Sequence, residues 1–480
     1  MRPAVDPVPL TATAAAQVRR LRTPSVPARL LMLHPAVLIL AVWAVAVAFW
    51  ATAPASVVED STVAGQRAAS GHAIAYFAGC LGAFVLASVL AGVMAKRPAS
   101  GAGPVAPLDH SPARALRQAA LGISMAAVFG GFVWFLRAGM LVGGPIELLR
   151  AYGGGSGVAL KLEVVGPAQL APVTTMVHLS PAAVGALLYY RQTRGWQRTE
   201  RLLFAGLIAV TVVRATLFAE RLAAMAVVSA GIVTVVICAQ QLDGRRFLRW
   251  VVIGACVSWV AWTTGEFFRS FRDTRPPGQS TAFTPANYLS SWSYSSNRLG
   301  AYVFSAIDNG IIIVEEWPTQ VFPRQTSGTL VAMGVPAAGT DAPDLFNSSL
   351  DPEFTGKTLF GSFFMDARDF GILLAALFGA FFGFAWRAAA RGSVAGIVMY
   401  AATVQVVLDS YRMNYLLGTA GLVAIFGALT ILAATETDKR RGVRGSPAAR
   451  GVPGKTRAAI GPAATSPGLV GRSPRPPRRS

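Results

Sequence analysis

The sequence predicts an all-α fold, a polytopic transmembrane bundle of about ten helices with a large extracytoplasmic loop before the last three spans. Of the 480 residues, 53% are hydrophobic and only 14% are charged, and the mean hydropathy is +0.48. A soluble domain carries about 25% charged residues, so a large soluble helical core is disfavoured. The apolar residues also fall into blocks of about 20, the length that crosses the hydrocarbon layer.

Each apolar block is predicted to be a helix, because backbone N–H and C=O groups in lipid must be paired within their own segment. Most blocks are separated by clusters of charged residues, whereas the three blocks between residues 202 and 265 are less cleanly divided. The predicted spans are 31–53, 73–95, 116–136, 168–190, 202–219, 221–240, 247–265, 369–386, 393–408 and 415–434.

The predicted spans divide the chain into five regions. Residues 1–30 and 435–480 are rich in Pro, Ala, Arg and Ser and are expected to be disordered cytoplasmic tails, the second strongly basic. Transmembrane helices one to seven occupy 31–265, and the last three occupy 369–434. Residues 266–368 between them form the predicted extracytoplasmic loop.

Basic residues are distributed unevenly between alternate loops. With alternating crossings and a cytoplasmic N-terminus, most of the 43 Lys and Arg residues fall in the tails and in the inner loops. This is the positive-inside pattern, and it predicts that both termini are cytoplasmic. The net charge of +20 then reflects topology and attraction to membrane lipids. Nucleic-acid binding is not expected, because the charges lie on separate loops instead of one face.

The region 202–240 has no Gly–Pro break at its centre. A single helix of this length would run about 58 Å, nearly twice the hydrocarbon thickness. It would also put the basic loops 191–201 and 245–249 on opposite sides of the membrane, against the charge rule. Two crossings with a tight external turn near Glu220 are therefore predicted.

Charged residues interrupt the apolar sequence near that turn, at Arg214, Glu220 and Arg221. Charges within spans are costly and usually line a bundle interior or a watery cavity. One interpretation is structural: Glu220 pairs with one arginine, and both arginines extend to the interface. The other is an anion site, because the guanidinium fork suits phosphate and keeps its charge.

The outer segment combines aromatic residues with charge, notably Trp292, Tyr294 and Arg298, followed by Tyr302 and several carboxylates. Long external loops on a scaffold usually carry binding surfaces. Aromatic faces can stack on sugars while arginine holds anions, so a sugar–phosphate ligand fits this composition. An interfacial aromatic belt is the alternative.

Several motifs follow one another between residues 200 and 434. They are a mid-chain span containing an arginine (Arg214 or Arg221), Asn287-Tyr-Leu-Ser-Ser-Trp-Ser-Tyr294 with Arg298, Phe346-Asn347, Thr355, Phe360-Gly-Ser-Phe-Phe-Met-Asp366-Ala-Arg368-Asp369-Phe370-Gly371-Ile372 with Gly379 and Gly383, and Asp409-Ser-Tyr-Arg412. In their order, these motifs resemble the Wzy-type oligosaccharide repeat-unit (O-antigen) polymerases. A kinase assignment of Asp-Phe-Gly fails, because no glycine-rich loop or catalytic loop accompanies it.

The resemblance implies a membrane glycosyltransferase of the bacterial plasma (inner) membrane. Such enzymes transfer a growing glycan from undecaprenyl diphosphate onto a new lipid-linked repeat unit at the outer face, and the lipid diphosphate is released. The implied partners are a lipid-linked oligosaccharide, membrane lipids and a chain-length co-polymerase. No cofactor is implied, and no pair of His or Cys residues has metal-ligand spacing.

This reaction needs positive charge for the leaving diphosphate and a base for the attacking hydroxyl. The candidate catalytic residues are Arg214, Arg221, Arg298, Arg412, Asp366 and Asp369. The candidate substrate-binding residues are Arg368, Glu220, Tyr294, Trp292 and Asn347. Asp366, Asp369 and Glu220 are unranked as bases, and Asp369 is favoured as the N-cap of the eighth span.

Two alternatives stay open. An O-antigen-type ligase would use the same chemistry with a different acceptor. A non-enzymatic transporter or flippase for a glycolipid or anionic solute would place charges near mid-bilayer and broken helices in both halves. The charges here gather at the predicted outer side, which favours the enzyme.

Overall fold

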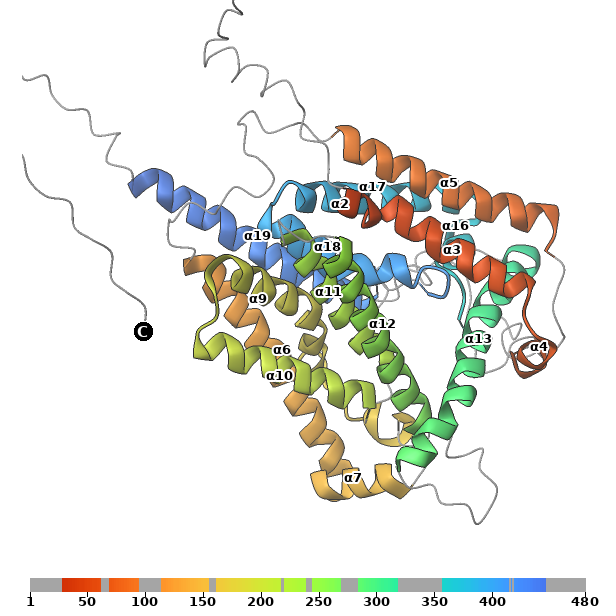
Figure 1. The fold of residues 1–480 in the computed structure, drawn as a ribbon, viewed down its shortest axis with the longest axis horizontal. Helices are drawn as coiled ribbons and strands as arrows, with labels where there is room; N and C mark the ends of the chain where they lie inside the picture. Colours follow the sequence, from red (N-terminus) through yellow and green to blue (C-terminus); the bar gives the residue numbers. More distant parts are fainter. Residues whose placement is uncertain are drawn as a thin grey trace, which may run out of the picture.

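The protein is an assembly of helices (Figure 1). Within the part of the chain that the structure describes, every regular element is helical and no strand occurs. The all-α prediction is confirmed for this part. The computed structural model describes residues 28–61, 69–94, 114–154, 161–216, 220–238, 244–268, 284–317, 356–413, 416 and 418–445.

In its described residues each predicted span overlaps an α-helix, and 168–190 and 369–386 each also include residues of a 3₁₀ turn. The elements up to Cys238 are α2 (Ala28–Met32), α3 (Pro35–Ala51), α4 (Ala55–Ser61), α5 (Gly71–Met94), α6 (Arg114–Leu141), α7 (Pro145–Gly154), η1 (Lys161–Val165), η2 (Thr174–Leu179), α9 (Ser180–Arg194), α10 (Arg198–Thr216) and α11 (Arg221–Cys238). The later elements are α12 (Gly244–Glu266), α13 (Pro285–Glu316), α16 (Leu359–Ala367), η4 (Arg368–Phe370), α17 (Gly371–Ala390), α18 (Val394–Leu408) and α19 (Thr419–Gly445).

Four helical segments among the described residues are long and apolar enough to cross a membrane. They are Gly71–Met94, Arg114–Leu141, Leu359–Ala390 and Thr419–Asp438. Shorter apolar helices are Pro35–Ala51, Leu222–Cys238 and Val394–Leu408. Large apolar side chains on the outer surfaces of these helices are exposed, among them Val45, Leu86 and Leu377. These features are compatible with a membrane protein, in which such side chains face lipid.

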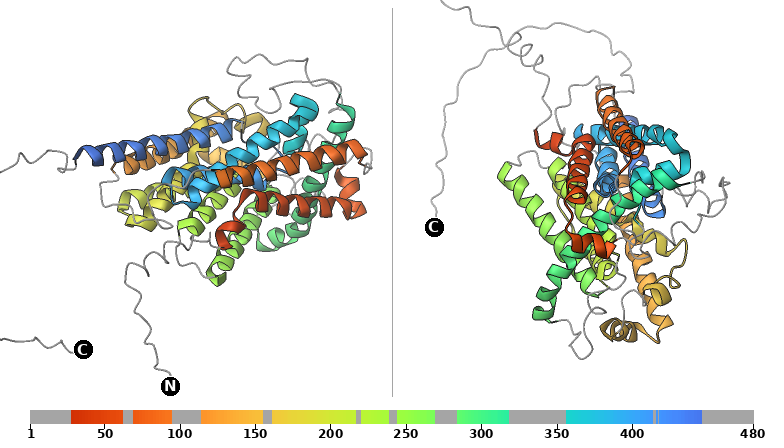
Figure 2. Two further views of the ribbon diagram at one scale, coloured as in Figure 1. Left: turned by 90° about the horizontal axis from the view of Figure 1, so that it is seen from above. Right: turned by 90° about the vertical axis from the view of Figure 1, so that its right-hand side faces the viewer.

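Helices α3, α5 and α19 share a common direction, α6 and α12 run obliquely to them, and α13 lies at one end (Figure 1). Figure 1 shows α3, α5 and α19 running along the long axis, with α13 at the right-hand end beside α4 and α16. Figure 2 shows the same elongated arrangement from above. The segment predicted as a loop at 266–368 thus contains two helices, α13 and α16, within its described residues.

The predicted break near Glu220 is confirmed, because α10 ends at Thr216 and α11 begins at Arg221. The backbone of Glu220 connects back to the end of α10, because its N–H donates a hydrogen bond to the carbonyl of Arg214 over 2.9 Å. The same turn therefore brings the two charged residues together.

Helices α5 and α17 pack closely because glycines remove the side chains between them. A Cβ atom at Gly379 would lie 2.2 Å from the Phe84 carbonyl oxygen, and one at Gly383 would lie 2.3 Å from the Ser88 carbonyl oxygen. The two glycines are four residues apart, the small-xxx-small spacing that lets helix backbones approach in membranes. This contact fixes α17 against α5 over at least one helical turn.

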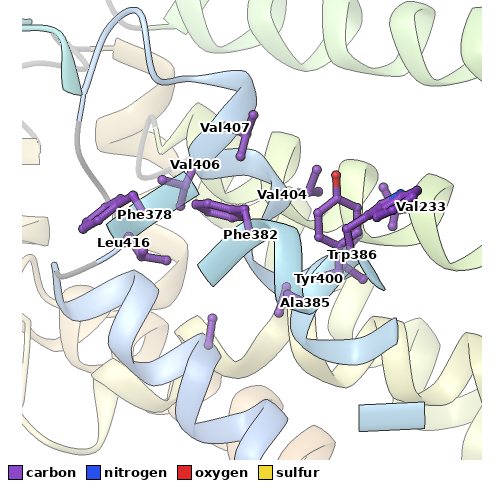
Figure 3. Close-up of a cluster of buried hydrophobic side chains, with 14 of the residues drawn as sticks. Val233, Phe378, Phe382, Ala385, Trp386, Tyr400, Val404, Val406, Val407 and Leu416 are labelled. Carbon is purple, nitrogen blue, oxygen red and sulfur yellow. The ribbon is translucent and has the colours of Figure 1, made fainter. Parts of the chain in front are cut away.

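Beside this contact, aromatic side chains fill the centre of the bundle (Figure 3). Phe382 and Trp386 of α17, Tyr400 of α18 and Val233 of α11 belong to one buried cluster. The Trp386 indole N–H donates to the Leu30 carbonyl over 3.1 Å, so the polar edge of the ring is satisfied. The core therefore joins α2 at the chain's first described residues to α17 and α18.

At the end of the bundle away from α13, charged groups tie three helices together. The Asp438 carboxylate of α19 accepts hydrogen bonds from the backbone N–H groups of Ala115 and Leu116, the first turn of α6. Arg117 of α6 donates from Nε to Glu200 of α10 over 2.6 Å. A carboxylate at a helix N-terminus satisfies orphan N–H donors and the helix dipole.

We predict that Gly383→Ala destabilises the protein and Gly82→Ala does not. The added methyl group at Gly383 meets the α5 backbone, whereas a Cβ at Gly82 would have nothing within 4 Å. Overpacking costs about 1–3 kcal/mol, while a helical Gly→Ala exchange in open space gains up to about 1 kcal/mol. Thermal unfolding of the purified protein in detergent measures both variants. Equal midpoints for the two would contradict the backbone contact.

Candidate functional site

Two of the arginines predicted to be catalytic, Arg298 and Arg412, lie against the same tyrosine ring, that of Tyr302. The Cζ atom of Arg298, on α13, lies 5.9 Å from the centroid of the Tyr302 ring. The Cζ atom of Arg412, in the turn after α18, lies 4.9 Å from the same centroid. Cations within about 6 Å of an aromatic ring are attracted by its quadrupole. The fold thus brings together two candidates that are far apart in sequence.

Each of these arginines also faces a buried carboxylate. Arg298 Nε lies 3.8 Å from Glu266 Oε2, with the Glu266 side chain 0% exposed. Arg412 Nη1 lies 3.9 Å from Asp409 Oδ2, with the Asp409 side chain 3% exposed. Buried charge is tolerated when an opposite charge compensates it. We call these five residues, Glu266, Arg298, Tyr302, Asp409 and Arg412, the Tyr302 cluster.

Aromatic packing holds the Tyr302 ring in place. The Trp262 ring of α12 meets it edge to face, with centroids 5.5 Å apart and an interplanar angle of 87°. The Trp262 indole N–H donates to the Ser295 carbonyl over 2.9 Å, which anchors α12 to α13. Val57 of α4 packs in the same apolar cluster. Three helices therefore orient the ring that the arginines contact.

A short segment before α16 lies against the Tyr302 cluster. The Asn309 side-chain N–H donates to the Gly356 carbonyl over 2.8 Å, and the Leu359 N–H donates to the Ser410 carbonyl over 2.8 Å. A Cβ at Gly356 would lie 3.5 Å from Arg412 Cγ. The segment is thus held between α13 and the turn that carries Arg412.

This segment carries Lys357, a residue that the sequence analysis missed. Burial lowers the pKa of Lys357 to about 8, and the nearby Asp366 carboxylate acts in the opposite direction. Asp366, a predicted candidate on α16, is itself 1% exposed. A lone lysine before an apolar run gives no sequence signal of burial, because the elements that cover it are distant in the chain.

Arg214 belongs to a second cluster. Its guanidinium pairs with Glu220, with Nη2 to Oε2 2.6 Å and Nε to Oε2 2.8 Å. Arg214 Nη2 also lies 3.4 Å from His178 Nδ1, and its Cζ lies 5.8 Å from the Trp134 ring centroid. This pairing is the one that the structural interpretation of these charges predicts, in which Glu220 pairs with one arginine. An anionic ligand would compete with Glu220 for the same guanidinium.

The C-terminal end of α12 adjoins both clusters. Glu266 faces Arg298, and Phe268, two residues later, packs against the apolar group that contains Trp134. The ring of Phe267 lies next to that of Tyr288 on α13, with centroids 6.4 Å apart. The Arg214 pair and the Tyr302 cluster therefore flank the same helix end.

Asp369 does not cap α17, so the favoured N-cap assignment is wrong. The N-cap is Phe370, which makes no side-chain cap hydrogen bond. Asp369 Oδ1 instead lies 3.0 Å from His72 Nε2 of α5, and both side chains are exposed. Arg368 adopts a left-handed φ of 53°, and its Cζ lies 5.1 Å from the Phe364 ring centroid. A one-residue left-handed break separates the helices and turns Asp369 toward α5.

The predicted aromatic residues lie on α13. Trp292 is 41% exposed, and its ring meets those of Trp259 and Tyr288 edge to face, each at 6.4 Å between centroids. Tyr294 is partly buried on the same helix. Two candidates cannot be placed: the Arg221 side chain and Asn347 lie outside the described part of the structure.

The arrangement suits a phosphate-bearing ligand more than a metal ion. Arginines present planar forks that match phosphate oxygens, and two of them lie at one tyrosine. No group of three or more His, Cys, Asp and Glu residues is placed to hold a metal ion within the described ranges. The chemistry available is anion stabilisation by the arginines and proton transfer by the buried ionisable groups.

We predict that Arg298→Leu is more destabilising alone than together with Glu266→Leu. The single change leaves a fully buried carboxylate without its nearby guanidinium, which costs about 3–5 kcal/mol. The double change removes both charges and recovers much of that loss. Thermal unfolding of the purified single and double variants measures the coupling. Strictly additive losses would contradict the ion pair.

Comparisons with models of protein families, with curated proteins and with solved structures find no match for this chain. Function is therefore inferred from the contacts, burial and charge of the residues themselves.

Proposed function

We propose that the protein is a polymerase of lipid-linked oligosaccharide repeat units for a surface polysaccharide. It transfers the growing glycan from undecaprenyl diphosphate onto the next lipid-linked unit, and the lipid diphosphate leaves. The observation that carries the proposal is the meeting of Arg298 and Arg412 at Tyr302. A leaving diphosphate develops negative charge, which preorganised cations stabilise.

The proposal includes the membrane topology. Ten spans with both termini in the cytoplasm place basic loops inside a bacterial plasma (inner) membrane. In that topology, the bundle end covered by α13 and α16 faces outward, and the Tyr302 cluster lies there. A lipid-linked substrate keeps its diphosphate near the membrane surface, at the depth where this cluster would act.

The carboxylates beside the arginines have a role in this scheme. Glu266 and Asp409 hold the guanidinium groups close to Tyr302 before substrate binds. Their distances from the arginine nitrogens, 3.8 Å and 3.9 Å, exceed those of tight charge-assisted hydrogen bonds. A diphosphate carries two or more negative charges, so it competes with these single carboxylates for the guanidinium groups.

The aromatic residues of α12 and α13 support binding of the glycan. Trp292 is partly exposed and is flanked by Trp259 and Tyr288. The Tyr288 hydroxyl lies 2.5 Å from the Thr263 hydroxyl, which connects the two helices at this point. Flat apolar rings with polar groups at their edges suit the faces of sugar rings, so this surface is a candidate platform for the repeat unit.

We predict that Arg298→Lys and Arg412→Lys each shorten the surface polysaccharide. Lysine retains the charge but loses the planar fork, and losing one oxyanion-stabilising donor costs about 100-fold in rate or more. Cells that lack the protein are complemented with wild type or a variant at matched membrane levels. Gel analysis of the surface glycan is expected to show single repeats and few long chains for both variants.

Arg150→Lys is the matched control, because Arg150 forms an exposed pair with Glu147 on α7 and is not a member of the Tyr302 cluster. It is expected to give wild-type chain lengths. Unchanged chain length in cells lacking the protein would overturn the polymerase proposal and favour a transporter. Loss of all surface glycan, single units included, would favour a ligase or flippase.

A further inference from the structure

The indole of Trp43, in the middle of α3, reaches the turn that carries Arg412. Its Nε1–H donates to the Ser410 hydroxyl oxygen over 3.1 Å. Both residues are buried, since Trp43 is 5% exposed and Ser410 is 0% exposed. Ser410 lies two residues before Arg412, one of the arginines of the Tyr302 cluster. A helix near the start of the chain is thus bonded to a turn that lies 367 residues later.

A second hydrogen bond fixes the register of α3 against α18. The Tyr400 hydroxyl of α18 donates to the carbonyl of Leu33, just before α3. Leu33 precedes Trp43 by ten residues, and Tyr400 precedes Ser410 by the same number, so both bonds have a sequence offset of 367 residues. Because the spacing is equal on both elements, α3 and α18 run parallel. Tyr400 holds one end of this pair, and Trp43 holds the end that bears Arg412.

The Trp43 ring also contacts α16. It stacks on the Phe360 ring, with centroids 4.9 Å apart and an interplanar angle of 25°. The N–H of Leu359, the residue before Phe360, donates to the Ser410 carbonyl over 2.8 Å. Ser410 is therefore held through its hydroxyl by α3 and through its carbonyl by α16, and the indole packs where the two elements meet.

Hydrogen bonds within the turn link Ser410 to Arg412. The Arg412 N–H donates to the Asp409 carbonyl over 2.9 Å, and the Asp409 N–H donates to the Gln405 carbonyl of α18 over 2.9 Å. The Arg412 Cζ atom at the end of this turn lies 4.9 Å from the Tyr302 ring centroid. A displacement of Ser410 therefore displaces the guanidinium, and a misplacement of about 1 Å can cost about 100-fold in rate.

Trp386 shows the same kind of bond in another part of the core. Its indole N–H donates to the Leu30 carbonyl over 3.1 Å, and the residue is 4% exposed. Its burial and the length of its hydrogen bond thus match those of Trp43. Its partner belongs to α2, however, whereas the partner of Trp43 belongs to the turn that bears Arg412. Comparing the two separates the loss of a buried hydrogen bond from the loss of the arginine's position.

We propose that Trp43 is a positioning residue of the proposed polymerase, and that it acts through Ser410 to set where the Arg412 guanidinium meets the leaving diphosphate. The indole holds the turn in place before substrate binds. The cation then needs no reorganisation when negative charge develops on the diphosphate, which is the condition for strong electrostatic stabilisation. The inference rests on the proposed function, because the role of Arg412 does.

Trp43→Phe tests the proposal, with Trp386→Phe as the matched control. Each change keeps an aromatic ring and removes one buried indole N–H, so both are expected to lower the unfolding midpoint of the purified protein to a similar degree. Rates of chain extension are measured at matched protein levels in membranes that carry endogenous lipid-linked repeat units. Trp43→Phe is expected to lose about tenfold in rate or more, and Trp386→Phe to keep the wild-type rate.

A second comparison tests whether Trp43 acts through Arg412. In Arg412→Lys the guanidinium that Trp43 positions is already gone, so adding Trp43→Phe is expected to lower the rate further by less than about twofold. A residue that only stabilised the fold would give its full loss in both backgrounds. Ser410→Ala is expected to reproduce the loss of Trp43→Phe, and combining these two is expected to add nothing, because both remove the same hydrogen bond.

Equal rates for Trp43→Phe and Trp386→Phe would overturn the inference, as would losses that multiply in the Arg412→Lys background. If Trp43→Phe does not fold, Ser410→Ala provides the same test without removing a ring. Wild-type membranes that extend chains assign such a failure to this inference alone. Wild-type membranes that extend none would overturn the proposed function, and this inference with it.

Discussion

The close approach of α5 and α17 is the constraint on which the candidate site depends. Gly379 and Gly383 let the backbone of α17 contact that of α5 directly. Because α16 precedes α17 with only η4 between them, fixing α17 also fixes α16. The segment carrying Lys357 is thereby held against α13 and the turn after α18. A contact made of backbone alone thus positions charged side chains at the end of the bundle.

Charge compensation is the second requirement at this end of the protein. Glu266, Asp366 and Asp409 are almost fully buried, and water does not stabilise them. Arg298 and Arg412 face two of these carboxylates. Opposite charges placed close together lower the cost of burying them. In the Tyr302 cluster these charges come from α12, α13 and the turn after α18, whereas Arg214 and Glu220 lie at one turn between neighbouring helices.

Hydropathy predicted where the helices lie, because the apolar length of a span is a local property. It missed α13 and α16, which lie in the segment predicted as a loop; serines such as Ser290, Ser291 and Ser295 make the first half of α13 read as polar. Arg298 and Arg412 were named as candidates through the family resemblance, but their meeting at Tyr302 depends on packing between distant elements.

Two site residues show why local sequence was insufficient. Lys357 is partly buried because α13 and the turn after α18 contact the residues beside it. Asp369 has the residue type and position of an N-cap, yet the left-handed conformation of Arg368 directs it to His72. In both cases a contact with a distant element decided the environment.

The pairing of Asp438 with the first turn of α6 concerns the order in which the protein assembles. The backbone N–H groups of Ala115 and Leu116 donate to the carboxylate of Asp438, which lies more than 300 positions later in the chain. During synthesis, α6 is made long before α19. The N–H groups of the first turn of α6 can be paired with Asp438 only after the last helix has been made, so closure of that end of the bundle is a late, non-local step of folding.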